Sequence, residues 1–137
     1  MNGLHLCADL GGCAPNAPSM RDPDSLRALC VHAVREAGLG AVAELFHCFS
    51  PVPGQELSGI TGVVLLAESH LAVHTWPELG AVTLDVYVCN LSEDNAAKAE
   101  ALLARLQQAF SPRETVIQRI ERGRLGGTLD GRLSPSR

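Results

Sequence analysis

The segment AESHLAVHTWPE, residues 67–78, gathers several side chains that can do chemistry. It holds a serine hydroxyl (Ser69), two imidazoles (His70 and His74) and two carboxylates (Glu68 and Glu78). A hydroxyl next to a base can act as a nucleophile, and a pair of imidazoles can bind a metal ion. A strand whose polar face is simply solvated has the same composition. Residue types alone therefore leave several kinds of site open.

A zinc site is one of these interpretations, because His70 and His74 are four residues apart. That spacing suits a helix, as in the HExxH zinc motif. The segment has β-branched residues, a proline and no helical period, and on a strand residues four apart are separated by about 13 Å. Two ligands cannot share one ion at that distance, so we predict no metal site. A hydrolytic triad is disfavoured because no Gly-x-Ser-x-Gly motif surrounds Ser69.

The elements that must position these side chains follow the order β-α-β-β-β-β-α-β. Strands are predicted at residues 4–10, 41–49, 60–67, 72–75, 82–88 and 114–120, and residues 11–23 are predicted to form a loop. Helices are predicted to begin at Asp24 or Ser25 and at Ser92 or Asp94, and to end before Gly38 and Pro112. Strands clustered between two helices predict an α+β two-layer sandwich, a mainly antiparallel sheet with two helices packed on one face.

Length and composition limit the classes of function. The chain has 137 residues, of which 46% are hydrophobic, so we expect a single domain over residues 1–124 and a flexible tail over residues 125–137. A net charge of −4 and 4% aromatic residues disfavour nucleic acid as a partner. The apolar runs are too short for a membrane span, and the first residues lack a signal peptide, which predicts a cytoplasmic protein. Its five cysteines are expected to be free thiols.

Motifs spread over most of the chain match one family. Residues 67–78, followed by LDVYVCN, closely resemble the central motif of the bacterial and archaeal S-adenosylmethionine decarboxylases, small pyruvoyl enzymes that cut themselves at a Glu-Ser bond. Further matches to the family pattern are Gly3, His5, Leu6, Ala8, Cys13, Phe46, His47, Phe49, Pro51, residues 61–64 and residues 121–124, and Asp9 stands where the family has glutamate. The resemblance covers about residues 3–124.

The resemblance implies roles for individual residues. Ser69 falls at the serine that becomes the pyruvoyl cofactor and binds substrate as a Schiff base, so the zymogen would be cut after Glu68 into residues 1–68 and 69–137. His74, five residues on, falls at the histidine that accepts a proton in processing, and Cys89, twenty residues on, at the cysteine that donates a proton in catalysis. The implied carboxy-lyase reaction decarboxylates S-adenosylmethionine, which supplies aminopropyl groups for spermidine. The family also implies a homo-oligomer with active sites at a dimer interface.

Chemistry argued from the residues agrees with that implication. Decarboxylating an amino acid needs an electron sink, which a cofactor usually supplies. The chain has one lysine, Lys98, far from the motif, and no evident phosphate cradle, so a ketone made from Ser69 is the alternative sink. An imidazole, which His74 supplies, is a common general base, and a thiol, which Cys89 supplies, is in general a suitable proton donor at neutral pH. A buried core cysteine is the other interpretation of Cys89.

Substrate identity rests on two further residues. The family implies that the ring of Phe49 stacks on adenine and that the carboxylate of Glu78 holds ribose hydroxyls. Core packing of Phe49 and a solvated loop end at Glu78 are the alternatives. The loop at residues 50–60, which borders the implied pocket, is longer than the usual link of the family. A pyruvoyl-dependent ornithine or arginine decarboxylase on the same fold, and a homologue that never cleaves, therefore remain open.

Strand geometry adds a constraint on the site. Five residues along a straight strand place Ser69 and His74 on opposite faces. The chain must therefore bend between them, or the cleavage site must lie in a turn. We expect a turn near residues 68–70.

Overall fold

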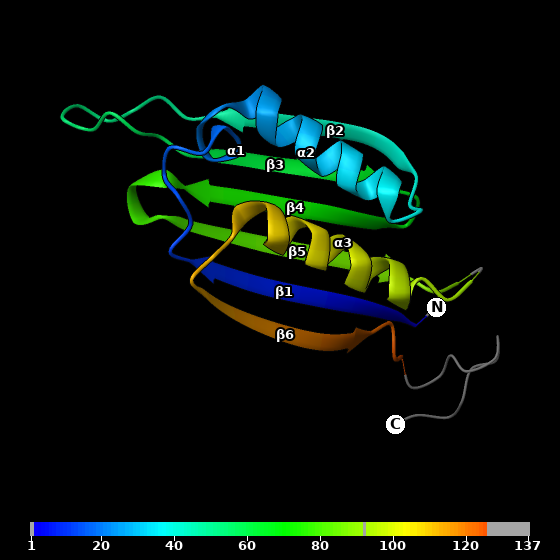
Figure 1. Ribbon diagram of the computed structural model, residues 1–137. Coiled ribbons are helices and arrows are strands. Elements are labelled where there is room, and N and C mark those ends of the chain that lie inside the picture. The colour runs from blue at the N-terminus through cyan, green and yellow to red at the C-terminus, as the bar shows by residue number, and fades with distance from the viewer. Residues whose placement is uncertain (1, 92, 126–137) are drawn as a thin grey trace.

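The computed structural model describes residues 2–91 and 93–125, and these residues build one six-stranded sheet (Figure 1). The strands lie in the order β2-β3-β4-β5-β1-β6, and every neighbouring pair is antiparallel. Their bounds are β1 Gly3–Gly11, β2 Ala41–Cys48, β3 Ile60–Leu66, β4 Ser69–Trp76, β5 Ala81–Cys89 and β6 Glu114–Arg122. All six predicted strands are present, and the fourth is longer than the predicted 72–75.

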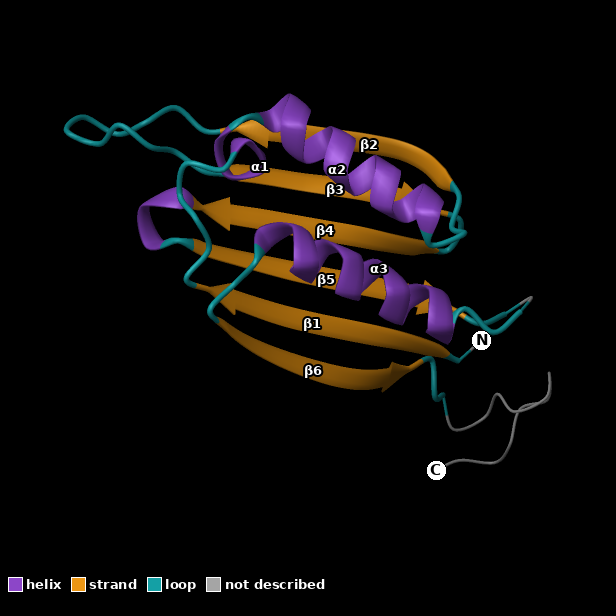
Figure 2. Cartoon of the chain, viewed as in Figure 1, coloured by secondary structure: helices purple, strands orange, loops and turns teal. Residues whose placement is uncertain are grey.

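Two long helices cover one face of the sheet (Figure 2). Helix α2, Pro23–Glu36, packs over β2 and β3, and helix α3, Ala96–Phe110, packs over β5 and β1. In the described part of the chain, no helix covers the opposite face. The predicted two-layer α+β sandwich is confirmed. The sequence did not indicate the short helices α1, Pro18–Arg21, within the predicted loop, or η1, Pro77–Leu79.

Both helix starts differ from the predicted caps. Asp22 caps α2, because its side chain accepts a hydrogen bond from the Ser25 backbone N–H (3.2 Å), and Pro23 takes the first helical position. Asn95 occupies the cap position of α3, one residue after the predicted Asp94. Ser92, the other predicted cap, lies outside the described residues. The predicted ends are within two residues of those observed, at Glu36 and Phe110.

The hydrophobic core lies between the helices and the sheet face that they cover. On β4, for example, Leu71, Val73 and Thr75 are buried, whereas His70 and His74 on the alternate positions are half-buried. The largest fully buried side chains are Leu6, Met20, Leu26, Ile60, Leu71, Leu84, Leu102 and Leu106. This alternation assigns each residue of the central strands either to the core or to the uncovered face.

Two further findings concern the predicted tail and the predicted absence of a membrane span. Strand β6 continues to Arg122, so the fold reaches nearly to the predicted domain boundary at residue 124. Residues 126–137 lie outside the described residues, and the predicted tail is untested there. No helix in the described ranges has the length and hydrophobicity to cross a membrane.

Candidate active site

A tight hairpin presents the serine of the 67–78 segment. Ala67 and Glu68 form the turn between β3 and β4, and Ser69 is the first residue of β4. The backbone of Glu68 has a φ of 60°, in the left-handed region that residues other than glycine, asparagine and aspartate rarely adopt. The turn therefore lies just before Ser69, whereas we expected it at residues 68–70. The peptide bond between Glu68 and Ser69 joins a strained residue to a strand end.

Strand pairing brings Ser69 and Cys89 together. Cys89 ends β5, the strand beside β4, and its backbone N–H donates a hydrogen bond to the Ser69 Oγ (3.0 Å). The Cys89 side chain is only 8% exposed, so this contact is largely screened from solvent. We call Ser69 and Cys89 the serine half-site. The sequence predicted both residues as functional, but not that the Cys89 backbone contacts the serine.

His74 lies apart from this pair. Strand β4 runs without a break from Ser69 to Trp76, so five residues separate Ser69 and His74 by about 17 Å and place them on opposite faces. His74 contacts β3 instead, where its Nδ1 lies 2.9 Å from the Thr61 hydroxyl. The opposite faces were predicted, whereas a bend that would reunite the two residues is absent between Ser69 and Trp76.

An open cavity of about 230 Å³ adjoins His74. Phe49, Glu78 and the exposed loop between β2 and β3 also line it. The loop closes on itself at its base, since the Phe49 N–H donates to the Gly59 carbonyl (3.0 Å) and the Ser58 hydroxyl donates to the Phe49 carbonyl. The ring of Phe49 is 51% exposed, so it is not core packing. We call Phe49, Thr61, His74 and Glu78 the histidine half-site.

The two half-sites occupy opposite ends of the sheet (Figure 1). The β3–β4 turn and the end of β5 lie at one end, and the β2–β3 loop and η1 lie at the other. Each half-site thus holds part of the predicted set, and one chain does not bring the halves together.

A polar cluster that the sequence did not indicate lies on the uncovered face. His5 Nε2 is 3.0 Å from Asp85 Oδ1 and 3.5 Å from Cys7 Sγ. These are the only three His, Cys, Asp or Glu side chains in the described ranges that are close enough together to hold one metal ion. Both contacts converge on His5 Nε2, which links Cys7 and Asp85 through one imidazole nitrogen. His70 and His74, the pair considered and rejected as zinc ligands from the sequence, are not part of it.

Burial and charge shift the pKa values of two side chains on the uncovered face, Cys7 of this cluster and the nearby His70. Burial, and then hydrogen bonding and repulsion from Asp85, raise the pKa of the Cys7 thiol. Burial first, and then the nearby His5, lower the pKa of His70. Both pKa shifts favour the neutral form, of the thiol at Cys7 and of the imidazole at His70, which directly follows Ser69 on β4. The sequence does contain a signal for this cluster, because His5 and Cys7 are two residues apart on one strand and therefore lie on the same face of β1.

Comparison with known proteins decides the family. A family model described as S-adenosylmethionine decarboxylase matches residues 4–123. The chain belongs to the S-adenosylmethionine decarboxylase family. It is 33% identical over 121 residues to a protein of Methanococcus maripaludis named S-adenosylmethionine decarboxylase proenzyme, covering 88% of this chain and 89% of the relative. It is 36% identical to the protein of the same name from Pyrococcus horikoshii, over 88% of this chain and 78% of the relative.

A solved structure of this decarboxylase family agrees with the fold. The adenosylmethionine decarboxylase from Aquifex aeolicus is 35% identical, with a TM-score of 0.76, over 88% of this chain and 90% of that one. A Trypanosoma brucei AdoMetDC monomer has a TM-score of 0.53 at 12% identity and shows a likeness of fold alone. Membership in the family that the motifs indicated is thus confirmed.

Proposed function

We propose that this chain is a self-cleaving, pyruvoyl-dependent S-adenosylmethionine decarboxylase that makes the aminopropyl donor for spermidine. The observation that carries the proposal is the hydrogen bond from the Cys89 N–H to the Ser69 Oγ beside the strained Glu68, in a chain of this decarboxylase family. This hydrogen bond holds the Ser69 hydroxyl next to the Glu68–Ser69 peptide bond, which self-processing of this family would cut.

Self-cleavage uses only atoms of the chain and water. The Ser69 Oγ attacks the Glu68 carbonyl carbon, and the C–N bond breaks, so that an ester replaces the amide. A base then removes the Ser69 Cα proton, and the Cβ–Oγ bond breaks. Glu68 leaves as a new carboxyl terminus, and the dehydroalanine at position 69 hydrolyses to a pyruvoyl group with loss of ammonia. A pyruvoyl ketone supplies the electron sink for decarboxylation.

His74 is the proposed base, and it must come from a second copy of the chain. Within one chain it lies about 17 Å along β4 from Ser69. By alternation the side chain of Cys89, which neighbours Ser69, lies on the uncovered face, as does that of His74. A homodimer that packs uncovered sheet faces together can therefore bring the serine half-site of one copy to the histidine half-site of the other. That face exposes apolar side chains that a partner would cover, including Leu45, Leu65 and Ile120.

The histidine half-site also supplies the proposed substrate contacts. Its cavity is lined by an exposed aromatic ring, Phe49, and by the carboxylate of Glu78. An aromatic face suits stacking of adenine, and a carboxylate accepts hydrogen bonds from ribose hydroxyls. We assign Phe49 to the adenine and Glu78 to the ribose of S-adenosylmethionine.

Cys89 is the proposed proton donor in turnover. Decarboxylation leaves a carbanion that needs a proton, and a thiol is mostly protonated at neutral pH. Its position beside Ser69 is where that proton is needed.

Intact mass spectrometry of the purified protein tests the proposal. We expect fragments ending at Glu68 and beginning with a pyruvoyl group at position 69, with Ser69→Ala remaining whole. A wild-type chain that stays at full length after prolonged incubation contradicts self-cleavage. Release of labelled CO₂ is then compared for S-adenosylmethionine, ornithine and arginine. Preferential release from ornithine or arginine contradicts the substrate assignment while leaving the cleavage chemistry intact.

A further inference from the structure

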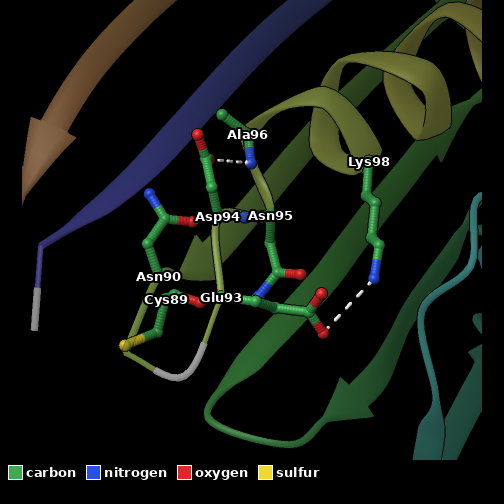
Figure 3. A network of polar contacts seen from close by, with 7 residues as sticks. All are labelled: Cys89, Asn90, Glu93, Asp94, Asn95, Ala96 and Lys98. Carbon is green, nitrogen blue, oxygen red and sulfur yellow. Dashed lines mark hydrogen bonds and ion pairs between the residues drawn. The ribbon is translucent and has the colours of Figure 1, made fainter.

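Two asparagine side chains tie the loop after β5 to the end of that strand (Figure 3). The Asn95 side-chain amide donates a hydrogen bond to the Cys89 carbonyl oxygen (2.9 Å). The Asn95 backbone N–H donates to the Asn90 side-chain oxygen (2.8 Å). Both asparagines are half-buried. We call this pair of contacts the asparagine clasp.

The clasp completes a set of contacts that fixes Cys89 from both sides. On the amino-terminal side, the Cys89 N–H donates a hydrogen bond to the Ser69 Oγ (3.0 Å). On the carboxyl-terminal side, the Cys89 carbonyl oxygen accepts a hydrogen bond from the Asn95 side chain, and the Asn90 N–H donates one to the Asn2 carbonyl oxygen (2.8 Å). Both peptide groups that flank Cys89 are therefore tied to neighbouring segments. Rotation of the Cys89 backbone would break at least one of these hydrogen bonds.

We propose that Asn95 is a positioning residue for self-cleavage, which acts through the Cys89 backbone to hold the Cys89 N–H on the Ser69 Oγ. This inference rests on the proposed function and adds a residue that sets the rate of one step of self-cleavage. The clasp fixes the donor before any chemistry begins, so no reorganisation is needed when charge appears.

We expect the clasp to act on the elimination, the step of self-cleavage in which the Ser69 Cβ–Oγ bond breaks. The base takes the Ser69 Cα proton, the electron pair of that C–H bond forms the Cα=Cβ bond, and the Cβ–Oγ bond breaks. Oγ keeps the electrons of the broken bond and leaves as one oxygen of the new Glu68 carboxylate. Negative charge therefore develops on the atom that accepts the Cys89 N–H in the uncleaved chain. A donor already aimed at that atom stabilises the transition state more than the starting ester.

The two asparagines use different atoms, which provides a matched pair of variants. Asn90 contributes its side-chain oxygen to the clasp, and Asn95 contributes its side-chain nitrogen. Asn90→Asp keeps an oxygen acceptor in place. Asn95→Asp has the same shape but replaces the donor with a carboxylate that repels the Cys89 carbonyl. The same chemical change thus preserves the clasp at one position and breaks it at the other.

A neighbouring residue controls for damage to α3. The Asp94 carboxylate accepts a hydrogen bond from the Ala96 N–H (2.9 Å) at the start of α3, and no hydrogen bond joins it to Cys89 among the described residues. Asp94→Ala therefore weakens the beginning of the helix without touching the clasp.

The experiment follows self-cleavage by intact mass in the wild type and these variants, with hydroxylamine added to parallel samples. Hydroxylamine cleaves an ester and not an amide, so it reports chains halted before elimination. We expect Asn95→Asp to cleave about ten- to a hundredfold more slowly, below the full cost of deleting an oxyanion donor, and to accumulate the ester. Asn90→Asp and Asp94→Ala should cleave at close to the wild-type rate.

Three outcomes would contradict the positioning role proposed for Asn95 without contradicting the proposed function. They are wild-type cleavage by Asn95→Asp, equal slowing by Asp94→Ala, and slow cleavage without accumulated ester. Thermal unfolding midpoints are measured for all variants. If Asn95→Asp does not fold, Asn95→Ala, which removes the donor without adding charge, gives the same test. A wild-type chain that never cleaves contradicts the proposed function itself.

Discussion

The serine half-site and the histidine half-site are built in different ways. In the first, register between β4 and β5 sets the contact, because a backbone N–H of one strand end meets a side chain of the other. In the second, a long exposed loop and a short 3₁₀ helix surround a cavity. Bond cleavage requires placement within a fraction of an ångström, whereas a binding pocket tolerates loops supported by a rigid scaffold. The atoms proposed to react are therefore positioned by strand pairing, and the proposed binding residues by loops.

The comparison also explains why both halves contain residues of β4. Ser69 begins that strand and His74 lies near its end, so a single straight strand carries one member of each half-site. A rigid strand keeps them apart in every copy. In the proposed homodimer, the second copy brings His74 of its own β4 to Ser69 of the first.

Mixing two inactive variants should give the largest effect. Ser69→Ala supplies His74 but no serine, and His74→Ala supplies the serine but no base. Alone, neither should cleave well. After mixing under conditions that exchange subunits, the His74→Ala chain should be cut, because a mixed dimer has one complete site.

Intact mass identifies which chain was cut, since the two variants differ in mass. The control mixes Ser69→Ala with a double variant that also lacks Ser69, which should give no cleavage. Cleavage of His74→Ala alone at the wild-type rate, or none in the mixture despite proven subunit exchange, contradicts a site shared between copies.

Loss of the proposed proton donor is expected to have the next largest effect. Cys89→Ala keeps the backbone N–H that contacts Ser69, so it should still cleave. Its kcat for decarboxylation should fall by about 10²–10⁴-fold, the usual contribution of a general acid, with little change in KM. Steady-state kinetics on the cleaved enzyme measure both constants. Cys7→Ser is the matched control, and a wild-type kcat in Cys89→Ala would make Cys89 a core residue only.

Changes at Phe49 and Glu78, the cavity-lining residues proposed as substrate contacts, should act on binding rather than on cleavage. Removing the ring in Phe49→Ala should raise the KM for S-adenosylmethionine roughly ten- to a hundredfold, on the scale of about 1–3 kcal/mol for base stacking. Phe49→Tyr keeps the ring and should bind almost normally. Self-cleavage should continue in both variants. An unchanged KM in Phe49→Ala removes this residue from the pocket.

The smallest effect is expected at Glu78. Glu78→Gln replaces a charged acceptor with a neutral amide, and the loss of part of a hydrogen bond should raise KM about two- to tenfold. Glu56→Gln, in the same loop region but away from the lining of the cavity, is the control. Kinetics at several salt concentrations separate a specific contact from general charge attraction. Equal changes in both variants argue against a ribose contact.

The strands and their faces could be predicted from the sequence because they depend on local alternation. Apolar residues at every second position of β4 are enough to assign Ser69 and His74 to opposite faces of the strand. The family motifs supplied the candidate functional residues. What the sequence could not give depends on long-range register: Cys89 meets Ser69 only because β5 pairs with β4 at a particular offset.

Short elements and side-chain contacts were also beyond prediction. The four-residue helix α1 lies in a segment rich in proline, where loop and helix signals overlap. Asn90 and Asn95 have no pattern that marks them, since asparagine is common in turns of every kind. The contact that each makes depends on where β5 ends and α3 begins.

The strand order gives cleavage at Glu68 an unusual outcome. The first fragment would carry β1, β2 and β3, and the second would carry β4, β5 and β6. In the sheet, β1 lies between β5 and β6, so a strand of one fragment is inserted between two strands of the other. The fragments are interlocked, and neither can leave without pulling β1 out of the sheet. Cutting the chain would thus turn one polypeptide into an obligate heterodimer without a covalent link between the fragments, and its refolding after denaturation would become a bimolecular reaction.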